Sequence, residues 1–160
     1  MTDISIRDVL EADLEVLFEI QTDADGQFMA AFTDTSNDRE KYLRKHRQLL
    51  ADDGVVQKVI VVDGEVVGSV ASFVLDGDRE VTYWIRREFW GRGIATKALA
   101  VLLGDVTVRP VFARAVHDNI GSIRVLERNG FVRIGEEESF AEARRGDVRE
   151  IIFRLDSGRG

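Results

Sequence analysis

Residues 83–99 of the chain read YWIRREFWGRGIATKAL, and this stretch decides the fold. It begins with residues typical of a strand, passes through Gly91-Arg92-Gly93, and continues over Ile94–Leu103 with apolar residues at the spacing of one helix face. Glycines let the backbone approach a ligand closely, and the first amides of a helix, at its positive dipole end, attract an anion. The pattern predicts a phosphate site. The alternative is a tight turn that only packs well.

Two known phosphate motifs do not match this stretch. A Walker loop requires a glycine before Lys97, where Thr96 stands, and a dinucleotide turn requires an acidic residue about 20 positions later, which Arg109 to Ala115 lack. The antiparallel strands expected upstream also differ from the repeated strand-helix-strand units of a dinucleotide fold. The predicted anion site therefore belongs to another class.

The strands upstream of the glycine turn are expected to form an antiparallel meander. Val55–Val62 and Glu65–Val74 flank Asp63-Gly64, a dipeptide that suits a two-residue hairpin turn because both positions accept positive φ. A third strand, Glu80–Ile85, follows the turn residues Asp76-Gly77-Asp78. Three consecutive strands therefore lead into the glycine turn.

The N-terminal third of the chain is expected to contribute one strand and two helices. Ile4–Arg7 has the character of a strand, and Leu14–Gln21 has the apolar spacing of a helix. A polar stretch, Asp23–Ser36, separates this helix from the next one. Asn37, with Glu40 three residues later, resembles a capping box and predicts the start of the second helix.

The C-terminal elements complete a mixed sheet. They are a helix, a strand, a helix closed by a glycine, and two strands, over Ile94–Leu103, Val111–Val116, Ile120–Asn129, Phe131–Ile134 and Glu150–Leu155. The expected order is β-α-α-β-β-β-α-β-α-β-β, an α/β (α+β) fold with a mostly antiparallel central sheet flanked by helices. Residues 1–156 are expected to form a single domain and residues 157–160 a flexible tail.

The composition argues against several classes of function. A net charge of −7 and a sequence pI near 4.9 disfavour nucleic-acid binding through a basic face. The sequence has no cysteine, which excludes thiolate metal sites and an acyl-cysteine intermediate, and its two separated histidines predict no metal site. No apolar run has the length of a membrane helix, so we expect a cytoplasmic protein without a membrane partner.

Residues 83–99 resemble the coenzyme A binding motif of GNAT acetyltransferases. Downstream, Asn119-Ile120-Gly121-Ser122 and the stretch Leu126-Glu127-Arg128-Asn129-Gly130-Phe131 are similar to the Asn-x-x-Ser and Gly-Phe ending of the ribosomal-protein (Rim-type) N-acetyltransferase branch. Trp90 stands where the superfamily turn usually has Gln or Arg, as an aromatic residue often does in that branch. The expected element order over the whole chain agrees with that fold.

The resemblance implies acetyl-CoA as the acyl donor, an amine as the acceptor and no metal. It also implies that backbone amides from Arg92 to Lys97 hold the diphosphate of coenzyme A. The coenzyme contacts that it implies lie at the end of a strand, on the glycine turn and at a second helix start: Tyr83, Trp84, Ile85, Arg86, Gly91, Arg92, Gly93, Ile94, Ala95, Thr96, Asn119 and Ser122.

Glu80 is the candidate catalytic base. Strand alternation places Glu80, Thr82 and Trp84 on the face opposite the apolar core residues of the same strand, and a polar face on a central strand is typical of a cleft. There Glu80 would take a proton from the attacking amine, directly or through water, and the resemblance favours the same role. The alternative is a solvated carboxylate.

Ser122 is the second candidate catalytic residue. The resemblance implies that its hydroxyl donates a proton to the departing thiolate, and that Asn119 contacts the pantetheine arm or the acceptor. The alternative for this turn is helix capping, which Asp118 or Asn119 would provide well.

The segment between the first two helices is the candidate acceptor site. Phe28, Met29 and Phe32 would line an acceptor pocket together with Trp84; the alternative is that they form helix core. The predicted acceptor is a primary amine on a cationic molecule, either a protein N-terminus or a small cationic amine. This prediction depends on the net charge of −7, on three acidic residues around the segment, Asp23, Asp25 and Asp34, and on the resemblance to enzymes that acetylate α-amino groups. The alternative is that the charge serves only solubility.

Two other functions remain compatible with the residues. One is a noncatalytic sensor that binds coenzyme A on the same fold, and the other is an unrelated anion-binding module. Coenzyme A binding without turnover of any amine would favour the sensor. The sequence is compatible with a monomer or a homodimer.

Overall fold

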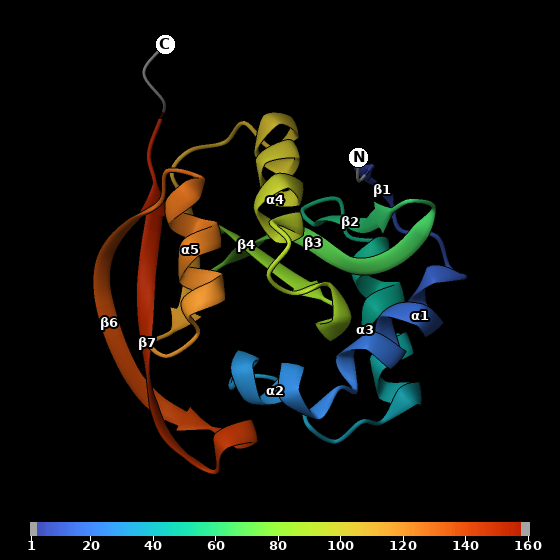
Figure 1. Ribbon diagram of the computed structural model, residues 1–160, viewed down its shortest axis with the longest axis horizontal. Helices are drawn as coiled ribbons and strands as arrows, with labels where there is room; N and C mark the ends of the chain where they lie inside the picture. Colours follow the sequence, from blue (N-terminus) through green and yellow to red (C-terminus); the bar gives the residue numbers. More distant parts are fainter. Residues whose placement is uncertain (1–2, 158–160) are drawn as a thin grey trace.

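The computed structural model describes residues 3–157, which form one seven-stranded sheet with helices on both faces (Figure 1). Residues 1–2 and 158–160, and with them most of the predicted tail, lie outside the described part. The strands are β1 (Ile4–Asp8), β2 (Val56–Val62), β3 (Glu65–Leu75), β4 (Asp78–Ile85), β5 (Val111–Val116), β6 (Val132–Ala141) and β7 (Gly146–Leu155). The helices are α1 (Asp13–Gln21), α2 (Ala24–Ala30), α3 (Arg39–Leu50), α4 (Ile94–Asp105) and α5 (Ile120–Arg128). Short 3-10 turns cover Arg87–Phe89 and Glu142–Arg144.

The sheet has one parallel junction, at its centre. The strand order is β1-β2-β3-β4-β5-β7-β6, and every neighbouring pair is antiparallel except β4 and β5. The mixed, mostly antiparallel sheet predicted from the sequence is thereby confirmed. β4 and β5 pair over only two positions, Arg79 with Val111 and Glu80 with Phe112. The two strands then part, so the sheet is split at its centre.

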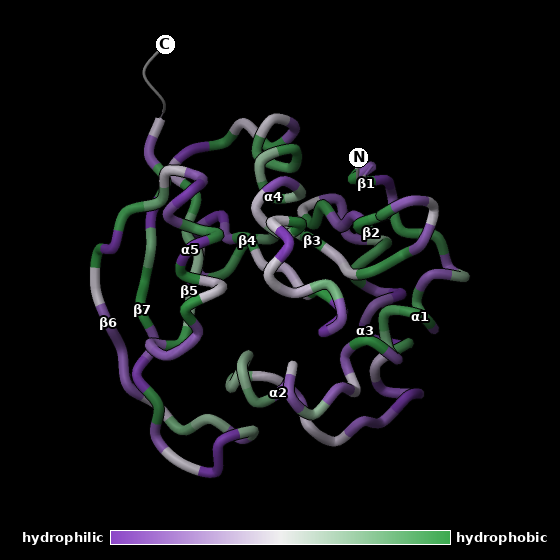
Figure 2. The backbone as a smooth tube through the Cα atoms, in the orientation of Figure 1, coloured by the Kyte–Doolittle hydropathy of each residue, from purple (hydrophilic) through white to green (hydrophobic). Residues whose placement is uncertain are grey.

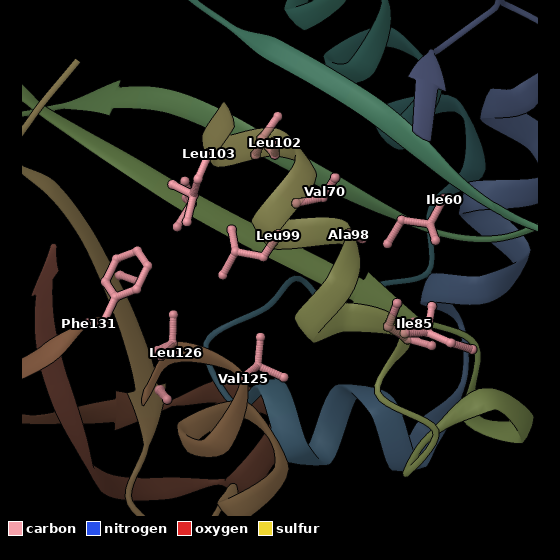
Figure 3. Packing of buried hydrophobic residues seen from close by; sticks show 14 of the residues in the cluster. Ile60, Val70, Ile85, Ala98, Leu99, Leu102, Leu103, Val125, Leu126 and Phe131 are labelled. Atoms are coloured by element: carbon pink, nitrogen blue, oxygen red, sulfur yellow. The ribbon is translucent and has the colours of Figure 1, made fainter. Parts of the chain in front are cut away.

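The main core lies between the sheet and the two helices α4 and α5. Leu99, Leu102 and Leu126 are fully buried there, against Ile60 of β2 and Val70 of β3 (Figure 3). Burial of this kind is the main favourable term in folding, at roughly 1.5–3 kcal/mol for each large apolar side chain. This packing fixes the position of α4, and with it the glycine turn from which α4 starts.

A smaller core lies on the opposite face, under α1 and α3. Leu14, Leu17 and Leu43 from the two helices pack on Val59 of β2, whose neighbour Ile60 belongs to the main core. Strand alternation thus sends successive residues of one strand into two cores.

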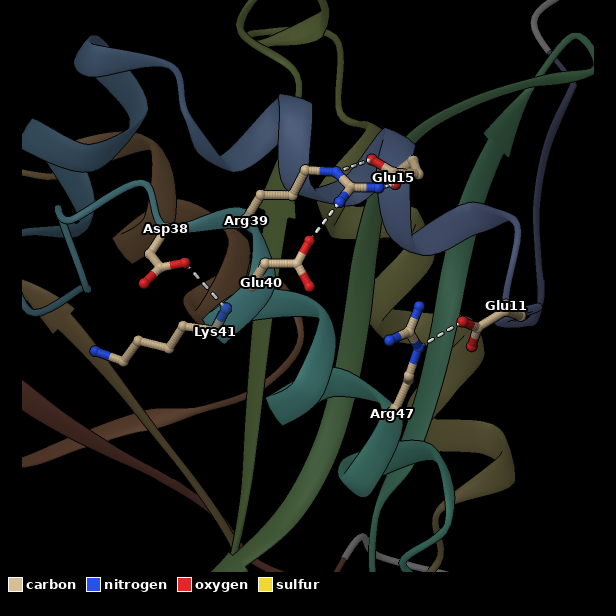
Figure 4. A network of polar contacts seen from close by, with 7 residues as sticks. All are labelled: Glu11, Glu15, Asp38, Arg39, Glu40, Lys41 and Arg47. Carbon is tan, nitrogen blue, oxygen red and sulfur yellow. Dashed lines mark hydrogen bonds and ion pairs between the residues drawn. The ribbon is translucent and has the colours of Figure 1, made fainter.

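Exposed ion pairs also join α3 to α1 and to the turn just before α1. Arg39 pairs with both Glu15 and Glu40, and Arg47 pairs with Glu11 at 2.6 Å (Figure 4). Such pairs contribute at most about 1 kcal/mol each, so apolar packing holds the two helices together.

Several local predictions are confirmed. Asp63 and Gly64 have φ of 49° and 85°, as the predicted two-residue hairpin turn requires. The predicted strand Val111–Val116 is β5, with the same bounds. Gly130 follows α5 with φ of 88°, a conformation in which glycine carries no steric penalty.

The polar stretch after α1 contains a helix that the sequence did not indicate. The Asp23 carboxylate accepts a hydrogen bond from the Gly26 amide at 2.9 Å and thereby starts α2. The predicted cap Asn37 is wrong by one position, because Asp38 caps α3 by accepting from the Lys41 amide at 3.1 Å. Asn37 has φ of 53°, outside the extended conformation that an N-cap adopts.

Other boundaries differ from the prediction as well. The helix expected over Ile94–Leu103 continues through Gly104 to Asp105. β6 and β7 have ten residues each, so Phe131–Ile134 and Glu150–Leu155 mark only parts of them. The acidic run in the middle of β6 shows no apolar alternation. As the outermost strand, β6 accepts polar residues on both faces, and Figure 2 shows its hydrophilic middle beside the mostly hydrophobic β7.

We predict that Gly68→Ala strongly destabilises the fold. A Cβ at Gly68 in β3 would lie 2.1 Å from the carbonyl oxygen of Trp84 in the paired strand β4, so two backbones would have to separate. The expected loss is about 3 kcal/mol or more in the free energy of unfolding, measured by urea denaturation. Gly135→Ala in β6 is the control, since a Cβ there meets nothing within 4 Å. Equal stability of the two variants would contradict this account.

Candidate active site

The glycine turn is fixed between β4 and α4. Gly91 and Gly93 have φ of 77° and 74°, in the region where glycine carries no steric penalty. The indole Nε1 of Trp90 donates a hydrogen bond to the carbonyl oxygen of Ile85 at 2.8 Å, which ties the turn to the end of β4. Trp90, at the position where the family motif usually has Gln or Arg, therefore anchors the turn through its side chain.

The first turn of α4 presents free amides. The Lys97 amide makes the first helical hydrogen bond, to the Gly93 carbonyl at 3.1 Å, and no side chain caps the helix. Among the described residues, the amides of Ile94, Ala95 and Thr96 have no acceptor. The first turn also carries no acidic residue. Three free donors at the positive end of a helix dipole form a suitable cradle for a phosphate group.

The space in front of this cradle is open. A Cβ placed on Gly91 or Gly93 would meet no atom within 4 Å. The residues present therefore fit the diphosphate of coenzyme A, because the backbone is exposed where a phosphate would approach it.

The split between β4 and β5 is the second feature of the site. Their pairing ends at Glu80 and Phe112, so the facing edges beyond these residues do not hydrogen-bond to each other. An exposed strand edge can pair with an extended ligand through its main-chain groups. The unpaired edge of β4 begins after Glu80 and ends at Ile85, and the glycine turn follows.

Glu80 lies at the vertex of this opening. Glu80 is only 8% exposed, and its carboxylate oxygen Oε1 lies 4.0 Å from Nε of Arg114 on β5. Arg114 also pairs with Glu137 of β6 at 2.8 Å and with Glu150 of β7 at 3.3 Å. One guanidinium thus faces three carboxylates. Glu80 is therefore buried, and the alternative that it is a solvated carboxylate is wrong.

Burial raises the pKa of the Glu80 carboxyl above its usual value. The positive charge of Arg114 opposes this shift, and the carboxylate of Glu150 adds to it. Burial also raises the pKa of Glu150, against the hydrogen bond from Arg114. Glu80 is therefore a stronger proton acceptor than an exposed glutamate.

Ser122 and Asn119 lie at the start of α5. The Ser122 hydroxyl oxygen is 2.6 Å from the Tyr83 hydroxyl of β4. Asn119 caps α5, because its Oδ1 accepts from the Ser122 amide at 3.2 Å, and its Nδ2 donates to the Met29 carbonyl oxygen at 3.4 Å. The capping interpretation of Asn119 is confirmed, and its contact with the acyl donor stays a prediction.

Glu80 and Ser122 flank the opening from opposite faces of the sheet. Tyr83, which contacts Ser122, lies with Val81 and Ile85 on the face of the main core. Glu80 alternates with these residues and therefore faces the other side, where Trp84 joins the smaller core. The predicted division of β4 into two faces is confirmed.

Helix α2 crosses the opening on the Glu80 side. Gly26 lies against the Trp84 ring on β4, and Phe32, just after the helix, packs with Val116 of β5. Phe28 is half exposed. The predicted acceptor segment is thus brought to the split, with Trp84 at one end and Phe32 at the other. Their contact with an acceptor stays a prediction.

Arg144, in the turn between β6 and β7, holds α2 in place. Its Nε donates to the Phe28 carbonyl oxygen at 2.6 Å, and its guanidinium lies 3.9 Å from the centre of the Phe28 ring. It also makes two hydrogen bonds of 2.9 Å to the carboxylate of Asp118, next to Asn119. This arginine therefore joins α2 to the start of α5.

The three acidic residues around the acceptor segment are already paired. Arg87 pairs with Asp25 at 2.7 Å and lies 3.6 Å from Asp23, and Lys41 pairs with Asp34 at 3.0 Å. The excess of negative charge near the site lies instead on the three carboxylates around Arg114.

Two arginines of the site, Arg114 and Arg144, were not predicted from the sequence. Arg114 could have been noticed, because it is a single charged residue within the apolar strand VFARAV. Arg144 gave no comparable signal, since it stands in a charged stretch that reads as a loop. Its role depends on contacts with Phe28 and Asp118, which are far from it in the sequence.

The remaining candidate residues lie around the glycine turn. The Arg92 guanidinium is 5.0 Å from the centre of the Phe89 ring. The Nε atom of Arg86 is buried and has no hydrogen-bond partner among the described residues.

Within residues 3–157, no three His, Asp or Glu side chains come together to hold a metal ion. The helices of the described chain are all too short or too polar to cross a membrane.

The family model of the acetyltransferase (GNAT) domain matches residues 3–132 of the chain. No curated protein sequence gives a significant match. Among solved structures, a probable acetyltransferase is 26% identical and superimposes with a TM-score of 0.76, covering 96% of this chain and 92% of the other. An unrelated anion-binding module is thereby excluded.

Two further structures share the fold at lower identity. RimL, a ribosomal alpha-N-protein acetyltransferase in complex with coenzyme A, is 18% identical, with a TM-score of 0.75 over 97% of this chain and 96% of the other. Spermidine N-acetyltransferase from Vibrio cholerae, in complex with coenzyme A and spermine, is 17% identical, with a TM-score of 0.79 over 94% and 95%.

We predict that Glu80→Gln stabilises the fold at high pH and not at low pH. The pKa of Glu80 is raised on folding, so the stability of the parent protein is fully present below the ordinary value near 4.5 and falls as the pH rises through the folded value. Glutamine does not ionise and removes this loss. The measurement is urea unfolding of parent and variant at about pH 4 and about pH 8.

Glu65→Gln is the matched control, because Glu65 is exposed at the start of β3. It should change the stability little at either pH. A Glu80→Gln variant with the same stability difference from the parent at both pH values would show that burial does not raise the pKa of this carboxyl.

Proposed function

The chain belongs to the GNAT acetyltransferase family and is an acetyl-CoA-dependent N-acetyltransferase, and we propose that it passes the acetyl group to a primary amine by direct attack in a ternary complex. The observation that carries this proposal is that Glu80 and Ser122 flank the split between β4 and β5 from opposite faces of the sheet. An acceptor on one face and the acyl donor on the other would meet in this opening.

The chain offers two sets of backbone groups for the donor, which supplies an activated thioester. The free amides of Ile94, Ala95 and Thr96 are suited to its diphosphate. The edge of β4 beyond Glu80 is suited to its extended arm. With both ends held, the reacting carbon would be fixed near the vertex of the opening, and positioning of this kind contributes strongly to rate.

Glu80 is the proposed base. An amine attacks only when it is neutral, and a carboxylate within reach removes the proton, directly or through water. The raised pKa of Glu80 supports this role, because a base works best when its pKa approaches the working pH.

Ser122 and backbone groups are proposed to act on the thioester of the donor. A main-chain N–H of the segment from Tyr83 to Arg86 would stabilise negative charge on the carbonyl oxygen. The Ser122 hydroxyl would donate a proton toward the departing sulfur. With no cysteine in the sequence, an acyl-cysteine intermediate is excluded, which supports direct transfer.

The proposed acceptor is a cationic molecule, either a protein N-terminus or a small cationic amine such as a polyamine or an aminoglycoside. The net charge of −7 supports this class, and so do the three carboxylates around Arg114 on the side where α2 lies. The two lower-identity structures described above acetylate, by their names, an alpha-amino group and a polyamine. Both are cationic amines near neutral pH.

We predict that Glu80→Gln and Ser122→Ala lower kcat by about 10² to 10⁴ and leave the affinity for coenzyme A nearly unchanged, because positioned proton transfer contributes that much to rate. Steady-state kinetics with saturating amine and calorimetric titration of coenzyme A measure the two effects. The matched controls are Glu65→Gln and Ser5→Ala, both at exposed positions. If the two site variants turn over like their controls, the proposed roles are wrong.

We also predict that transfer to cationic amines weakens with salt. Attraction between an acidic site and a cationic amine raises kcat/KM at low ionic strength and fades as the Debye length falls from about 30 Å to about 8 Å. The panel contains a polyamine, an aminoglycoside, a peptide with a free N-terminus and an anionic amino acid. Selective turnover of the anionic amine, insensitive to salt, would refute the proposed acceptor class.

A further inference from the structure

The Tyr83 side chain contacts the proposed acid, Ser122, at two atoms. Its hydroxyl lies 2.6 Å from the Ser122 hydroxyl and donates to the Ser122 carbonyl oxygen at 3.0 Å. We propose that Tyr83 is a positioning residue that directs the Ser122 proton toward the departing sulfur. This inference rests on the proposed function and adds to it a residue that acts through its side chain.

A count of protons defines two arrangements of this pair. Each hydroxyl has one proton, and the 2.6 Å contact uses one of the two. When Tyr83 donates to the Ser122 carbonyl oxygen, Ser122 must donate to Tyr83, and the serine proton is not available to a ligand. When Tyr83 donates instead to the Ser122 hydroxyl oxygen, the serine proton is free for the sulfur.

Rotation of both hydroxyl groups about their C–O bonds converts one arrangement into the other. Negative charge on the sulfur favours the second arrangement, because hydrogen bonds to a charged acceptor are stronger than those between neutral groups. The serine oxygen gains a donor as it gives its own proton toward the sulfur. Tyr83 therefore supports the charge on the leaving group without touching it.

Tyr83 is held rigidly and stays protonated. Its ring packs against the main core, and β4 pairs it with Val70 of β3. Burial raises the pKa of its hydroxyl to about 12, although the hydrogen bond with Ser122 lowers it. The hydroxyl is therefore a donor at every pH where the enzyme would work.

Without the Tyr83 hydroxyl, no group would orient the Ser122 proton toward the sulfur. A serine hydroxyl in a helix can donate to the carbonyl oxygen three or four residues before it. In Tyr83→Phe the Ser122 hydroxyl would have this competing acceptor and no donor to hold its oxygen. The phenyl ring would still fill the same space in the core.

The test compares Tyr83→Phe with Tyr42→Phe, the same change at the other of the two tyrosines in the sequence. Tyr42 lies on α3, where it packs against Phe18 and His46. For Tyr83→Phe we expect kcat to fall about tenfold with KM for acetyl-CoA unchanged, and for Tyr42→Phe we expect no change. In Ser122→Ala, adding Tyr83→Phe should cost nothing further, because the residue through which Tyr83 acts is absent.

A binding measurement provides a second readout. Free coenzyme A ends in a thiol, and its desulfo analogue lacks the sulfur. Above about pH 9, where a thiol ionises, the parent protein should prefer coenzyme A over the analogue, and Tyr83→Phe should reduce this preference severalfold. Melting temperatures of all variants show whether the fold is intact.

The outcomes separate the two proposals. Activity and thiol preference of Tyr83→Phe equal to those of the parent protein would overturn the role of Tyr83 and leave the proposed function standing. Losses that multiply in the double variant would also overturn it, because Tyr83 would then act independently of Ser122. Failure of the parent protein to acetylate any amine would overturn the proposed function, and this inference with it.

Discussion

The parting of β4 from β5 after Glu80 is the constraint on which the rest of the site depends. Elsewhere in the sheet, neighbouring strands pair along their length, so main-chain groups satisfy one another. Here the parallel pairing stops after two positions and leaves two strand edges facing an opening. The buried carboxylate of Glu80 lies at the vertex of this split. The unpaired edge of β4 beyond it offers main-chain groups with which an extended ligand can pair.

Different helices pack on the two strands that border this opening. α4 packs on β3 and β4 through the main core, and α5 packs on β5, so each arm of the split has its own support. On the opposite face α2 reaches from Trp84 on β4 to Val116 on β5. Arg144 fixes α2 through Phe28, which links the proposed acceptor side of the site to the β6–β7 turn. The proposed donor side, on α4 and α5, and the proposed acceptor side, on α2, thus share β4 and otherwise use different elements.

Much of this arrangement could be predicted from the sequence, because its signals are local. Asp63-Gly64 indicated the hairpin, and the glycine turn before an amphipathic helix indicated the anion site. The alternation along β4 placed Glu80 and the core residues on opposite faces.

The features that could not be predicted from the sequence depend on contacts between residues far apart in the chain. Helix α2 has a weak apolar pattern and is held by Arg144. β6 carries an acidic run that reads as loop, although Arg114 pairs with it across the sheet. The contact of Tyr83 with Ser122 joins residues 39 positions apart, and no periodic pattern reports such a contact.

The central claim is that the glycine turn and the split strands hold an acyl donor, and thermal unfolding with coenzyme A tests it most directly. A ligand at about 100 times its dissociation constant adds roughly 2.7 kcal/mol of stability, which corresponds to about 5 to 10 °C in Tm. The comparison is between Gly93→Val, which fills the space before the α4 amides, and Gly77→Val in the β3–β4 turn, where φ is 85° and a Cβ likewise meets nothing within 4 Å. Both glycines have positive φ, 74° at Gly93 and 85° at Gly77, so valine strains the backbone in both variants. The account predicts that coenzyme A raises the Tm of the parent protein and of Gly77→Val, and leaves that of Gly93→Val unchanged; an equal shift in both variants, or none in the parent, would contradict it.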